Sequence, residues 1–502
     1  MGLRKAGVRL REELDKLFTL NPSGLAYDSR RVEPGFVFFA IKGFVQDGHD
    51  YVADAIRRGA AGVVVERAVE VPAGVFVVRV ADTRLALALA AARFYGFPGR
   101  RLRLVGVTGT NGKTTTAHLI GALYQARGEK VGLIGTLYTR VGDLIIPEER
   151  TTPESLELQY FLKRMLEEGA TTVVMEVSSH ALALKRVAGL EFDAAVFTNL
   201  TQDHLDFHRD MEEYFRAKAE LFKELIRPGV KSRPKLSVLN IDDPYGVRLS
   251  ALSASRVITY GVDGAADLRA RDIALTGGGT RFVAEGPWGR VPVRLKLMGR
   301  FNVYNALAAL AVGLGEGFPP EETARVLEGV PAVAGRFERV DVGQDFTVVV
   351  DYAHTPDGLE NVLHAARALT KERVIVVFGC GGDRDPAKRP VMGELAGKLA
   401  DFTVVTSDNP RSEEPSAIIA AVEEGLKRVT GRERYILEPD RREAIALALE
   451  QAQTGDVVVI AGKGHEDSQI IGDAKLPFDD RQVAAAILRK LLQARDKGAK
   501  TG

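Results

Sequence analysis

Cysteine is almost absent from this chain, and its scarcity limits the chemistry that can be expected. The single cysteine, Cys380, leaves no intramolecular disulfide and excludes a zinc site built from several thiolates. An excess of charge of one sign is also lacking, since 68 Lys and Arg residues face 67 Asp and Glu residues and the formal net charge is +1. This balance gives no support to binding of a nucleic-acid polymer or a membrane surface through a polybasic face, although a local anion site remains open.

Long apolar runs are missing as well. No run reaches the roughly 18 residues of a membrane-spanning helix. The basic segment 1–11 lacks the apolar core and cleavage pattern of a secretory signal. We therefore expect a cytoplasmic protein without membrane insertion. The 502 residues are 45% hydrophobic and 27% charged, which is typical of a globular protein. At roughly 150 residues per domain, this length suggests about three domains.

Short apolar runs rich in Val and Ile alternate with longer helical patterns. Most of these runs lack the polar alternation of a half-exposed strand. They are typical of strands covered on both faces, as in parallel sheets with helical crossovers. The predicted fold class is therefore α/β. The runs are 62–65, 102–107, 172–177, 194–197, 346–350, 374–378, 402–406 and 457–461.

Two changes of pattern indicate domain boundaries. Phe97-Pro98-Gly99 follows an Ala- and Leu-rich helix predicted at 83–95 and precedes a new buried strand. A second change falls near residues 331–335, after a predicted helix that contains residues 321–327. We therefore expect three domains, which are 1–98, 99–332 and 333–502.

The strongest local motif is a Gly-rich turn between a buried strand and a helix. Gly109 and Gly112 would let the backbone wrap a phosphate, toward which the N–H groups at the helix start point. Lys113 would neutralise the β- and γ-phosphates, and the hydroxyl of Thr114 would join the shell of a Mg²⁺ ion. The general Walker pattern fits imperfectly, because its first glycine would fall at Val107. The alternative is an ordinary Gly/Thr turn before a helix.

Two further strand ends carry groups that suit a metal. In an open parallel sheet, ligands bind at the carboxyl ends of the strands. Glu176, near the end of the predicted strand 172–177, is then a candidate magnesium ligand, and His204 is a candidate ligand of a second ion. Alternatively, Asp203 and His204 cap a helix or satisfy a turn. A zinc hydrolase is a weaker alternative, because the chain has no His-Glu-x-x-His motif.

Three predicted strands of the C-terminal third each end in a polar motif. In a parallel sheet these motifs emerge at one edge and can converge. They combine two arginines with two carboxylates. An arginine fork binds a carboxylate, and Asp408 or Glu466 can pair with an ammonium group. The set suits a substrate with a carboxylate and an ammonium at each end. The motifs are 379–385, 407–411 and 462–466.

Taken together and in order, these motifs resemble those of the Mur ligases, ATP-dependent enzymes that build the peptide stem of peptidoglycan. The resemblance covers nearly the whole chain. It implies an N-terminal domain for a UDP-linked substrate, a central P-loop ATPase-like domain with a parallel sheet, and a Rossmann-like C-terminal domain that brings an amino acid. The residues that carry the resemblance are 109–114, 176–180, 199–208, 299–306, 335–338 and 351–356.

The resemblance also implies the ATP site and the catalytic groups. Asn302 would face the adenine, Asp351 the ribose and Arg336 the γ-phosphate, with His354 near the nucleotide. The implied ATP-binding residues are Gly109, Thr110, Asn111, Gly112, Lys113, Thr114, Thr115, Asn302, Arg336, Asp351 and His354. The implied metal ligands are Thr114, Glu176, His204 and Lys218, and the implied catalytic residues are Lys113, Lys218, His204 and Arg336.

Two further substrate sites follow from the same resemblance. The family often has Gln where this chain has Leu184, so one hydrogen bond to the substrate differs. The implied residues for the UDP-linked substrate are Tyr27, Asp28, Ser29, Arg30, Gly43 to His49, Thr151, Thr152, Ser178, Leu184 and Arg186. The implied amino-acid-binding residues are Arg384, Asp408, Asn409, Pro410, Arg411, Gly462 and Glu466.

Lys218 lies in a predicted helix shortly after the 199–208 motif. By its sequence context alone it would be an exposed helix lysine. The resemblance implies instead that CO₂ carbamylates it. A carbamate turns the cation into a bidentate anion, which suits a site that holds two magnesium ions beside a triphosphate.

The implied reaction is an ATP-dependent ligation in two steps. The γ-phosphate would pass to the terminal carboxylate of UDP-N-acetylmuramoyl-L-alanyl-D-glutamate, and the amine of meso-diaminopimelate would attack the acyl phosphate. Residues 408–411 are similar to the family motif for meso-diaminopimelate, whereas lysine-adding relatives differ at Arg411. The alternatives are the same ligation with L-lysine, a P-loop phosphotransferase or NTPase without ligation, and a non-catalytic nucleotide-binding scaffold. We expect a monomer.

Overall fold

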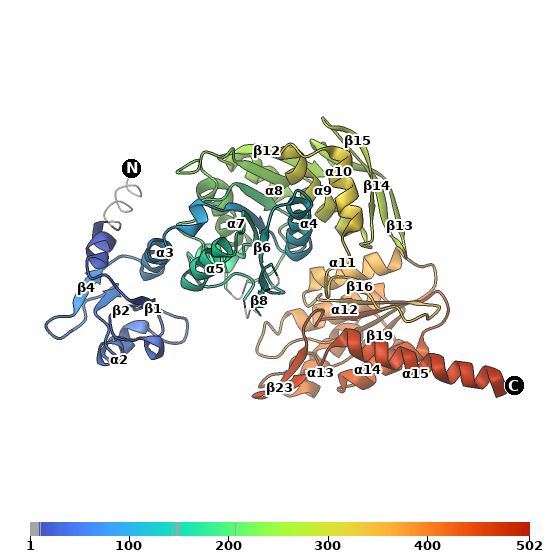
Figure 1. The fold of residues 1–502 in the computed structure, drawn as a ribbon. Coiled ribbons are helices and arrows are strands. Elements are labelled where there is room, and N and C mark those ends of the chain that lie inside the picture. The colour runs from blue at the N-terminus through green and yellow to red at the C-terminus, as the bar shows by residue number, and fades with distance from the viewer. Residues whose placement is uncertain (1–9, 11, 143, 147–149, 206, 502) are drawn as a thin grey trace.

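The computed structural model describes residues 10–501 apart from 11, 143, 147–149 and 206. Asp206, which belongs to the 199–208 motif, and the segment 1–9 therefore lie outside the described residues. The chain forms three bodies, each built on a main sheet of its own, that follow one another in Figure 1 from blue through green and yellow to red. Strands separated by helices confirm the predicted α/β class.

The N-terminal body holds a four-stranded sheet in the order β1-β2-β3-β4, and every pairing is parallel. One buried apolar cluster lies around Val37 and Val64, and another lies around Phe38 and Val63. Because successive residues of a strand point to opposite faces, both faces of this sheet are covered. The elements are β1 (Gly24–Ala26), η1 (Ser29–Arg31), β2 (Phe36–Phe39), η2 (Gly48–Tyr51), α2 (Val52–Arg57), β3 (Gly62–Val65), β4 (Phe76–Arg79), α3 (Thr83–Phe94) and η3 (Pro98–Arg100).

The central body holds an 11-stranded sheet in the order β15-β14-β13-β12-β11-β10-β5-β9-β6-β7-β8. It is parallel from β13 to β6 and antiparallel at both ends. The elements are β5 (Arg103–Thr108), α4 (Lys113–Ala126), β6 (Val131–Ile134), β7 (Thr139–Val141), β8 (Leu144–Ile146), α5 (Ser155–Glu167), β9 (Thr172–Glu176), α6 (Ser179–Ala183), β10 (Ala194–Phe197), α7 (Met211–Glu220), η4 (Leu221–Leu225), β11 (Leu236–Asn240), α8 (Pro244–Leu252), β12 (Arg256–Gly261), β13 (Leu268–Thr276), β14 (Gly279–Gly286), β15 (Gly289–Leu295), α9 (Arg300–Gly315) and α10 (Pro320–Gly329).

The strand order explains where a ligand can bind in this body. β9 and β6 lie on one side of β5, whereas β10, β11 and β12 lie on the other. The direction of strand addition therefore reverses at β5, and ligands of open α/β sheets bind outside the carboxyl ends of the strands at such a point. The Gly-rich turn directly follows β5 and so lies at this position.

The C-terminal body holds a six-stranded sheet in the order β16-β17-β21-β18-β19-β20, parallel except for β16. The carboxyl ends of β17, β18, β19 and β21 therefore lie at the same edge of the sheet. The elements are β16 (Glu338–Arg339), β17 (Thr347–Asp351), α11 (Pro356–Arg367), β18 (Val374–Phe378), α12 (Lys388–Leu399), β19 (Phe402–Val405), α13 (Pro415–Leu426), η5 (Arg432–Arg434), β20 (Tyr435–Leu437), α14 (Arg441–Gln451), β21 (Val457–Ala461), β22 (Ser468–Ile471), β23 (Ala474–Pro477) and α15 (Asp480–Thr501).

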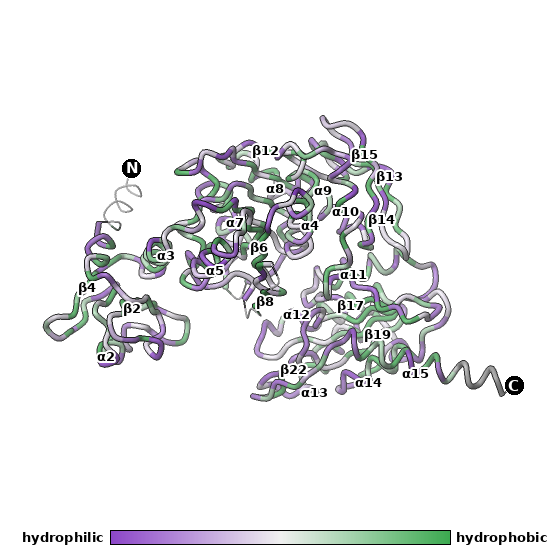
Figure 2. Tube along the Cα trace, in the orientation of Figure 1, coloured by the Kyte–Doolittle hydropathy of each residue, from purple (hydrophilic) through white to green (hydrophobic). Residues whose placement is uncertain are grey.

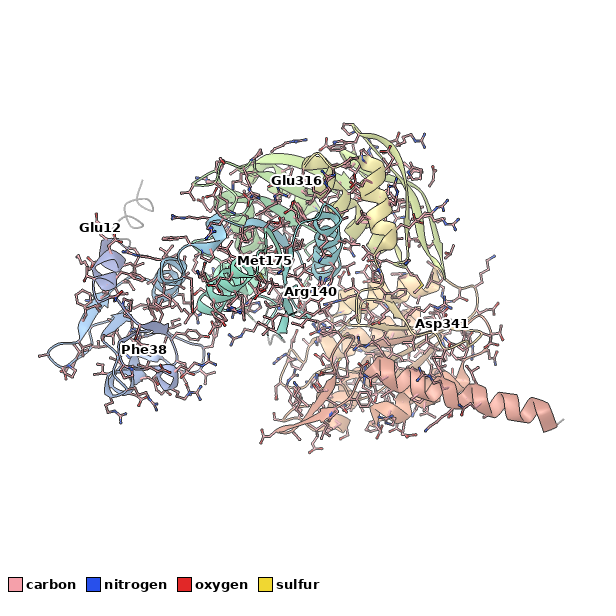
Figure 3. The ribbon with its side chains drawn as sticks, viewed as in Figure 1. Glu12, Phe38, Arg140, Met175, Glu316 and Asp341 are labelled. Carbon is pink, nitrogen blue, oxygen red and sulfur yellow. The ribbon has the colours of Figure 1, made fainter. Side chains whose placement is uncertain are left out.

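All eight apolar runs predicted as strands are strands here, with ends that agree within one residue. Each pairs in parallel with a neighbour, as their lack of polar alternation predicts. Phe38 of β2 and Met175 of β9 are buried and lie among packed side chains in Figure 3. Figure 2 shows hydrophobic residues gathered inside the C-terminal body around β17 and β19.

One helix contact in the C-terminal body depends on small residues. A Cβ atom on Gly393 of α12 would lie 2.0 Å from the carbonyl oxygen of Val422, and one on Gly425 of α13 would lie 1.8 Å from that of Pro390. We expect Gly425→Ala to lower the free energy of unfolding by about 3 kcal/mol, because the backbones must move apart. Urea denaturation measures this change.

The matched control is Gly329→Ala at the end of α10, where an added Cβ atom meets nothing within 4 Å. It should change the free energy of unfolding by less than about 1 kcal/mol, toward stabilisation. Equal effects of the two substitutions would contradict the close contact of α12 and α13.

Candidate active site at facing sheet edges

The Gly-rich turn has the geometry that its sequence predicts. It leads from β5 to α4, which begins at Lys113. Gly109 (φ +148°) and Gly112 (φ +84°) adopt backbone conformations that favour glycine. A Cβ atom on Gly109 would lie 1.8 Å from Oγ1 of Thr198 at the end of β10, so a larger residue does not fit. The start of this long helix therefore offers backbone N–H groups to an anion.

Two lysine amines share one carbonyl of this turn. Nζ of Lys113 lies 3.1 Å from the carbonyl oxygen of Gly109 and 2.7 Å from that of Thr110. Nζ of Lys218, from α7, donates to the same Gly109 oxygen at 2.8 Å. Two ammonium ions this close repel each other, and such repulsion favours the uncharged form of one of them.

Lys218 is the more deeply buried of the two lysines, with 1% of its surface exposed. Burial lowers the pKa of Lys218 well below its ordinary value, and the charge of Lys113 lowers it further. Burial also lowers the pKa of Lys113. The neutral amine is the form that adds to CO₂, so the surroundings of Lys218 fit the carbamate that the family resemblance implies.

Glu176 and Thr114 form a pair of oxygen donors beside the turn. Glu176 lies at the end of β9 and is 1% exposed. Its Oε2 accepts a hydrogen bond from Oγ1 of Thr114 at 3.1 Å, and its Oε1 accepts one from the backbone N of Thr136 at 2.9 Å. The described residues contain no group of three His, Cys, Asp or Glu side chains that could hold a metal. Mg²⁺ is commonly bound by one or two carboxylates together with phosphate oxygens and water, so this pair fits it.

His204 lies in the turn after β10 with a left-handed backbone (φ +56°). Its backbone N donates to Oδ1 of Asp203 at 2.8 Å, so the two residues do satisfy a turn. The ring of His204 packs edge-on against that of His180, with 4.7 Å between centroids. Burial lowers the pKa of His204 to about 4. The imidazole is therefore neutral near pH 7, which is the form that binds metals.

Side chains of the C-terminal body reach the nucleotide site. Nη2 of Arg336 donates to Oγ1 of Thr114 at 3.0 Å. Asp357, at the start of α11, accepts hydrogen bonds from Oγ1 of Thr201 at 3.0 Å and from the side-chain amide of Asn111. Arg336 thus lies beside the Gly-rich turn, where the resemblance places it against the γ-phosphate.

Three other residues predicted to bind ATP form hydrogen bonds within the protein. The buried amide of Asn302 both donates to and accepts from neighbours in its own segment. Both carboxylate oxygens of Asp351 accept backbone N–H groups, and burial raises its pKa to about 6. Nδ1 of His354 lies 2.8 Å from the carbonyl oxygen of Tyr352. Their contacts with adenine and ribose stay predictions.

The predicted residues for the UDP-linked substrate come from two bodies. In the central body, Oγ1 of Thr152 lies 3.3 Å from Oγ of Ser178 and 3.1 Å from its backbone N. Arg186 donates to the carbonyl oxygen of Thr152 at 3.0 Å and pairs with Glu154 at 2.8 Å. Oγ1 of Thr151 lies 3.1 Å from that of Thr136, and Leu184 directly follows α6. The structure brings Thr151, Thr152, Ser178 and Arg186 together beside Glu176.

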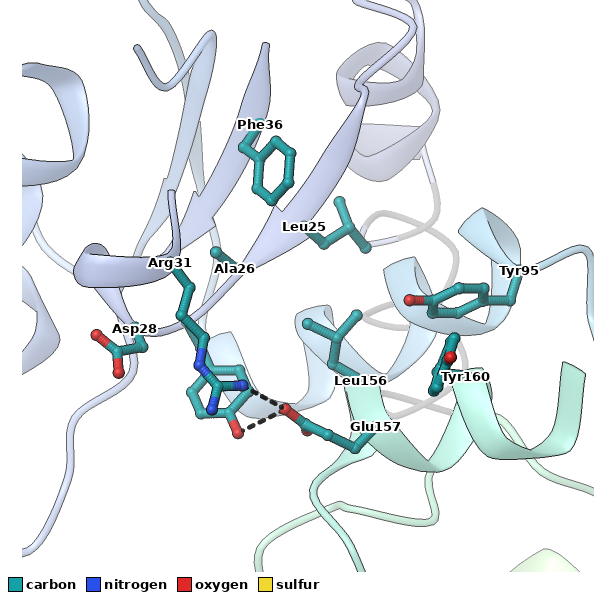
Figure 4. A pocket seen from close by; sticks show the side chains of 10 residues that line it. Leu25, Ala26, Asp28, Arg31, Phe36, Tyr95, Leu156, Glu157 and Tyr160 are labelled. Carbon is teal, nitrogen blue, oxygen red and sulfur yellow. Dashed lines mark hydrogen bonds and ion pairs between the residues drawn. The ribbon is translucent and has the colours of Figure 1, made fainter. Parts of the chain in front are cut away.

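A cavity of about 230 Å³ lies where the N-terminal body meets α5 (Figure 4). Tyr27 is one of its lining residues. Oη of Tyr27 donates to Glu157 at 2.9 Å, and Arg31 pairs with the same carboxylate at 3.7 Å. Ser29 follows in η1, and Gly43 lies in the loop after β2. The rest of the lining is Leu25, Ala26, Asp28, Phe36, Tyr95, Leu156 and Tyr160.

The motifs after β18, β19 and β21 converge as predicted. Nδ2 of Asn409 donates to Oε2 of Glu466 at 2.9 Å. A Cβ atom on Gly462 would lie 2.7 Å from Oδ2 of Asp408, so the third motif packs against the second. Burial raises the pKa of Asp408. A Cβ atom on Gly382 would lie 1.9 Å from the carbonyl oxygen of Pro410, so the second motif packs against the first.

Arg411 is the group of this site best suited to a carboxylate. Its Nη1 donates to the carbonyl oxygen of Gly382 at 2.7 Å, and no ion pair joins it to a carboxylate of the described residues. A Cβ atom on Gly381 would lie 3.0 Å from Nη1 of Arg411 and 3.7 Å from Cγ of Arg384, so both arginines flank that glycine. A guanidinium that binds only carbonyls keeps donors for an incoming carboxylate.

His465 provides a pH-dependent test of this part of the fold. Burial lowers its pKa to about 4, with Arg336 adding to the shift, and its buried Nδ1 has no hydrogen bond to any described residue. The unfolded chain therefore binds more protons than the folded one between pH 6.5 and pH 4, and stability falls as the pH falls through that window. We expect His465→Gln to flatten this fall, as measured by urea denaturation across the window.

The control for this prediction is His364→Gln on α11, whose side chain is largely exposed. It should leave the pH dependence as in the parent protein. A parent-like slope in His465→Gln would contradict the assignment.

Several residues of the site were not predicted. Oγ1 of Thr198 donates to the carbonyl oxygen of Asn111 at 2.6 Å, and Nδ2 of Asn199 reaches the same oxygen at 3.2 Å. Their position after a predicted strand that pairs with β5 was the available signal. No sequence pattern indicated a role for Asp357 or Lys463. The partner of Asp357, Asn111, lies far away in sequence, and the partner of Lys463, Asn409, belongs to a motif already assigned to substrate binding.

Comparison with known proteins connects these features. Three family models match along the chain, the Mur ligase family catalytic domain at residues 22–95, the Mur ligase middle domain at 107–313 and the Mur ligase glutamate ligase domain at 335–464. A UDP-N-acetylmuramoyl-L-alanyl-D-glutamate--2,6-diaminopimelate ligase of Geobacillus kaustophilus is 52% identical over 468 residues, which are 93% of this chain and 94% of that protein. The chain belongs to the Mur ligase family.

Solved structures agree with this assignment. The structure of a UDP-N-acetylmuramoyl-L-alanyl-D-glutamate--2,6-diaminopimelate ligase matches with a TM-score of 0.67 and 33% identity over 94% of this chain and 95% of that one. A MurF ligase from Thermotoga maritima in complex with ADP shares the fold, with a TM-score of 0.63 and 22% identity over 95% of this chain and 99% of that one. This Mur ligase is thus an ATP-dependent amide ligase. None of its described helices is long and apolar enough to cross a membrane.

Proposed function

We propose that this Mur ligase joins meso-diaminopimelate to UDP-N-acetylmuramoyl-L-alanyl-D-glutamate and converts ATP to ADP and phosphate. The observation that carries the proposal is Arg411, which lies beside the main chain of Asn409 but forms no ion pair with a carboxylate of the described residues. Diaminopimelate offers a distal carboxylate for it. The reaction belongs to peptidoglycan precursor synthesis and hence to cell wall biogenesis, on which cell shape and division depend.

The chemistry requires activation because an amine does not displace an oxygen from a carboxylate. The γ-phosphate passes to the carboxylate of the UDP-linked substrate, the amine attacks the acyl phosphate, and phosphate leaves. Lys113 and Arg336 lie beside the Gly-rich turn, where their charges offset those of the phosphates. Thr152, Ser178 and Arg186 lie where they can orient the carboxylate beside Glu176.

We propose that two Mg²⁺ ions take part, with Thr114 and Glu176 as ligands of one and with His204 and carbamylated Lys218 as ligands of the other. The bound ions would offset phosphate charge. The oxygen donors of Thr114 and Glu176 and the lowered pKa of Lys218 support these roles. We propose a monomer, and we place it in the cytoplasm with ATP and the UDP-linked precursor.

The preference for diaminopimelate follows from charge. L-lysine lacks the distal carboxylate, so its binding would leave Arg411 desolvated without an anion, which costs several kcal/mol. The same ligation with L-lysine is therefore the second candidate, and a phosphotransferase without ligation is the third. A phosphotransferase without ligation would not explain why the motifs after β18, β19 and β21 converge.

The deciding experiment measures ADP release with the UDP-linked dipeptide and each amino acid in turn. We expect release with meso-diaminopimelate at least about 100-fold faster than with L-lysine at equal low concentration. Activity with L-lysine alone would overturn the choice of amino acid. ADP release that is independent of any amino acid would support a phosphotransferase instead.

A further inference from the structure

We propose that Lys463 is a positioning residue for the amino-acid substrate, which fixes Asn409 and Glu466 so that one oxygen of Glu466 faces the substrate ammonium. The inference rests on the proposed function, because it concerns the same site. Lys463 follows β21 and is 0% exposed, so it cannot reach a ligand itself. Any effect it has on substrate must pass through its neighbours.

The contacts of Lys463 show which neighbours these are. Its Nζ donates to Oδ1 of Asn409 at 3.0 Å and to Oε2 of Glu466 at 2.8 Å, and it lies 3.8 Å from Oδ1 of Asp408. An ammonium group has three donors and no acceptor. Two of these donors are used in hydrogen bonds, and Asp408 lies at ion-pair distance, so all three oxygens around the ammonium belong to residues of the amino-acid site.

The orientation of the Asn409 amide follows from this contact. Its Oδ1 accepts from Lys463 and also from the backbone N of Ile470 at 3.0 Å. Its Nδ2 must then point the other way, where it donates to Oε2 of Glu466 at 2.9 Å. Without the ammonium, only the backbone N of Ile470 donates to the oxygen of this amide. The amide can then rotate so that its oxygen and nitrogen exchange places.

The consequence for Glu466 is an asymmetric carboxylate. Both Lys463 and Asn409 donate to Oε2, whereas Oε1 has no hydrogen-bond partner among the described residues. The side chain is 31% exposed, so the free oxygen is accessible. A carboxylate held by one oxygen presents the other to an incoming ammonium in a fixed direction, which lowers the entropy lost on binding.

Charge adds to the effect. The carboxylates of Asp408 and Glu466 lie close enough that Glu466 acts to raise the pKa of Asp408, as Asp480 also does, while Arg441 and Lys463 act to lower it. Burial acts to raise the pKa of Glu466, but Lys463, Asn409 and His465 outweigh it, so Glu466 stays ionised. A buried cation between two carboxylates favours the anionic form of each, which the pairing with an ammonium requires.

The test is a double-mutant cycle on the full-length enzyme. Lys463→Met removes the ammonium and keeps the length of the side chain. We expect it to raise KM for meso-diaminopimelate by about 10- to 100-fold, since charge-assisted hydrogen bonds are lost. KM for ATP and for the UDP-linked dipeptide should stay within about twofold, because their sites do not include this group. Lys398→Met, at an exposed position of α12, is the matched control and should leave all three values unchanged.

The second arm separates positioning from folding. Glu466→Gln alone should also raise KM for the amino acid, and Lys463→Met in that background should add less than about threefold. Effects that multiply, an unchanged KM in Lys463→Met, or a parallel rise for all three substrates would each overturn the proposal. Should circular dichroism show that Lys463→Met does not fold, Lys463→Gln takes its place in the cycle under the same criteria. Absence of diaminopimelate-dependent ADP release in the parent enzyme would refute the proposed function instead.

Discussion

Lys218→Met should lower the rate of ligation by about 1,000-fold at saturating substrates. Methionine fills the buried space of the lysine but cannot react with CO₂. In the proposed carbamylation, the amine, whose pKa burial and Lys113 lower, would add to CO₂ in its neutral form through its lone pair, and release of one proton would leave a carbamate anion. The variant loses this anion next to the Gly109 carbonyl, where the phosphates and metal ions are expected. A coupled assay of ADP release measures the rate.

Two further measurements make the result specific. Lys163→Met, on the exposed side of α5, should retain the parent rate. Carbon-13 NMR in labelled bicarbonate should show a carbamate signal in the parent protein that is missing from Lys218→Met. A variant with parent-like activity would remove Lys218 from the catalytic site. Low activity without any carbamate signal in the parent would leave the lysine essential but uncarbamylated.

Arg411→Met should lower kcat/KM for meso-diaminopimelate by about 1,000-fold, because two parallel charge-assisted hydrogen bonds to the distal carboxylate are lost. The parent arginine already adopts a left-handed backbone (φ +53°), so an unbranched methionine meets the same backbone strain. The ratio of activities with diaminopimelate and L-lysine should shrink by a similar factor. Steady-state assays with both amino acids measure it.

The control for this substitution is Arg428→Met, at an exposed position after α13. It should change neither kcat/KM nor the preference between amino acids. KM for ATP should remain at the parent value in Arg411→Met, because Arg411 lies outside the Gly-rich turn. An unchanged preference between the two amino acids would show that another group binds the distal carboxylate.

Local sequence predicted the features that depend on local physics. The strands predicted at 172–177 and 457–461 followed from continuous apolar runs, and the phosphate turn followed from Gly109, Gly112 and Lys113 between a strand and a helix. The convergence of the motifs after β18, β19 and β21 followed from the geometry of parallel sheets. These inferences needed only the periodicity of the chain and the conformational freedom of glycine.

Contacts between distant segments could not be predicted in the same way. Lys113 and Lys218 meet at one carbonyl although 105 residues separate them, and this follows from how α7 packs against the turn. The bond from Asn111 to Asp357 depends on how two bodies meet. The internal hydrogen bonds of the Asn302 amide depend on side-chain rotamers, and its contact with adenine stays a prediction.

The bonds from Arg336 to Thr114 and from Asp357 to Thr201 also limit how the protein can be divided. A fragment that ends before residue 333 would keep the long sheet and the phosphate turn but lose the arginine that reaches Thr114. Separately expressed halves should therefore recover catalysis only when they associate. Changes at Arg336 or Asp357 should therefore alter ATP kinetics although both residues belong to the same body as the amino-acid site, so the C-terminal body is not a module for amino-acid choice alone.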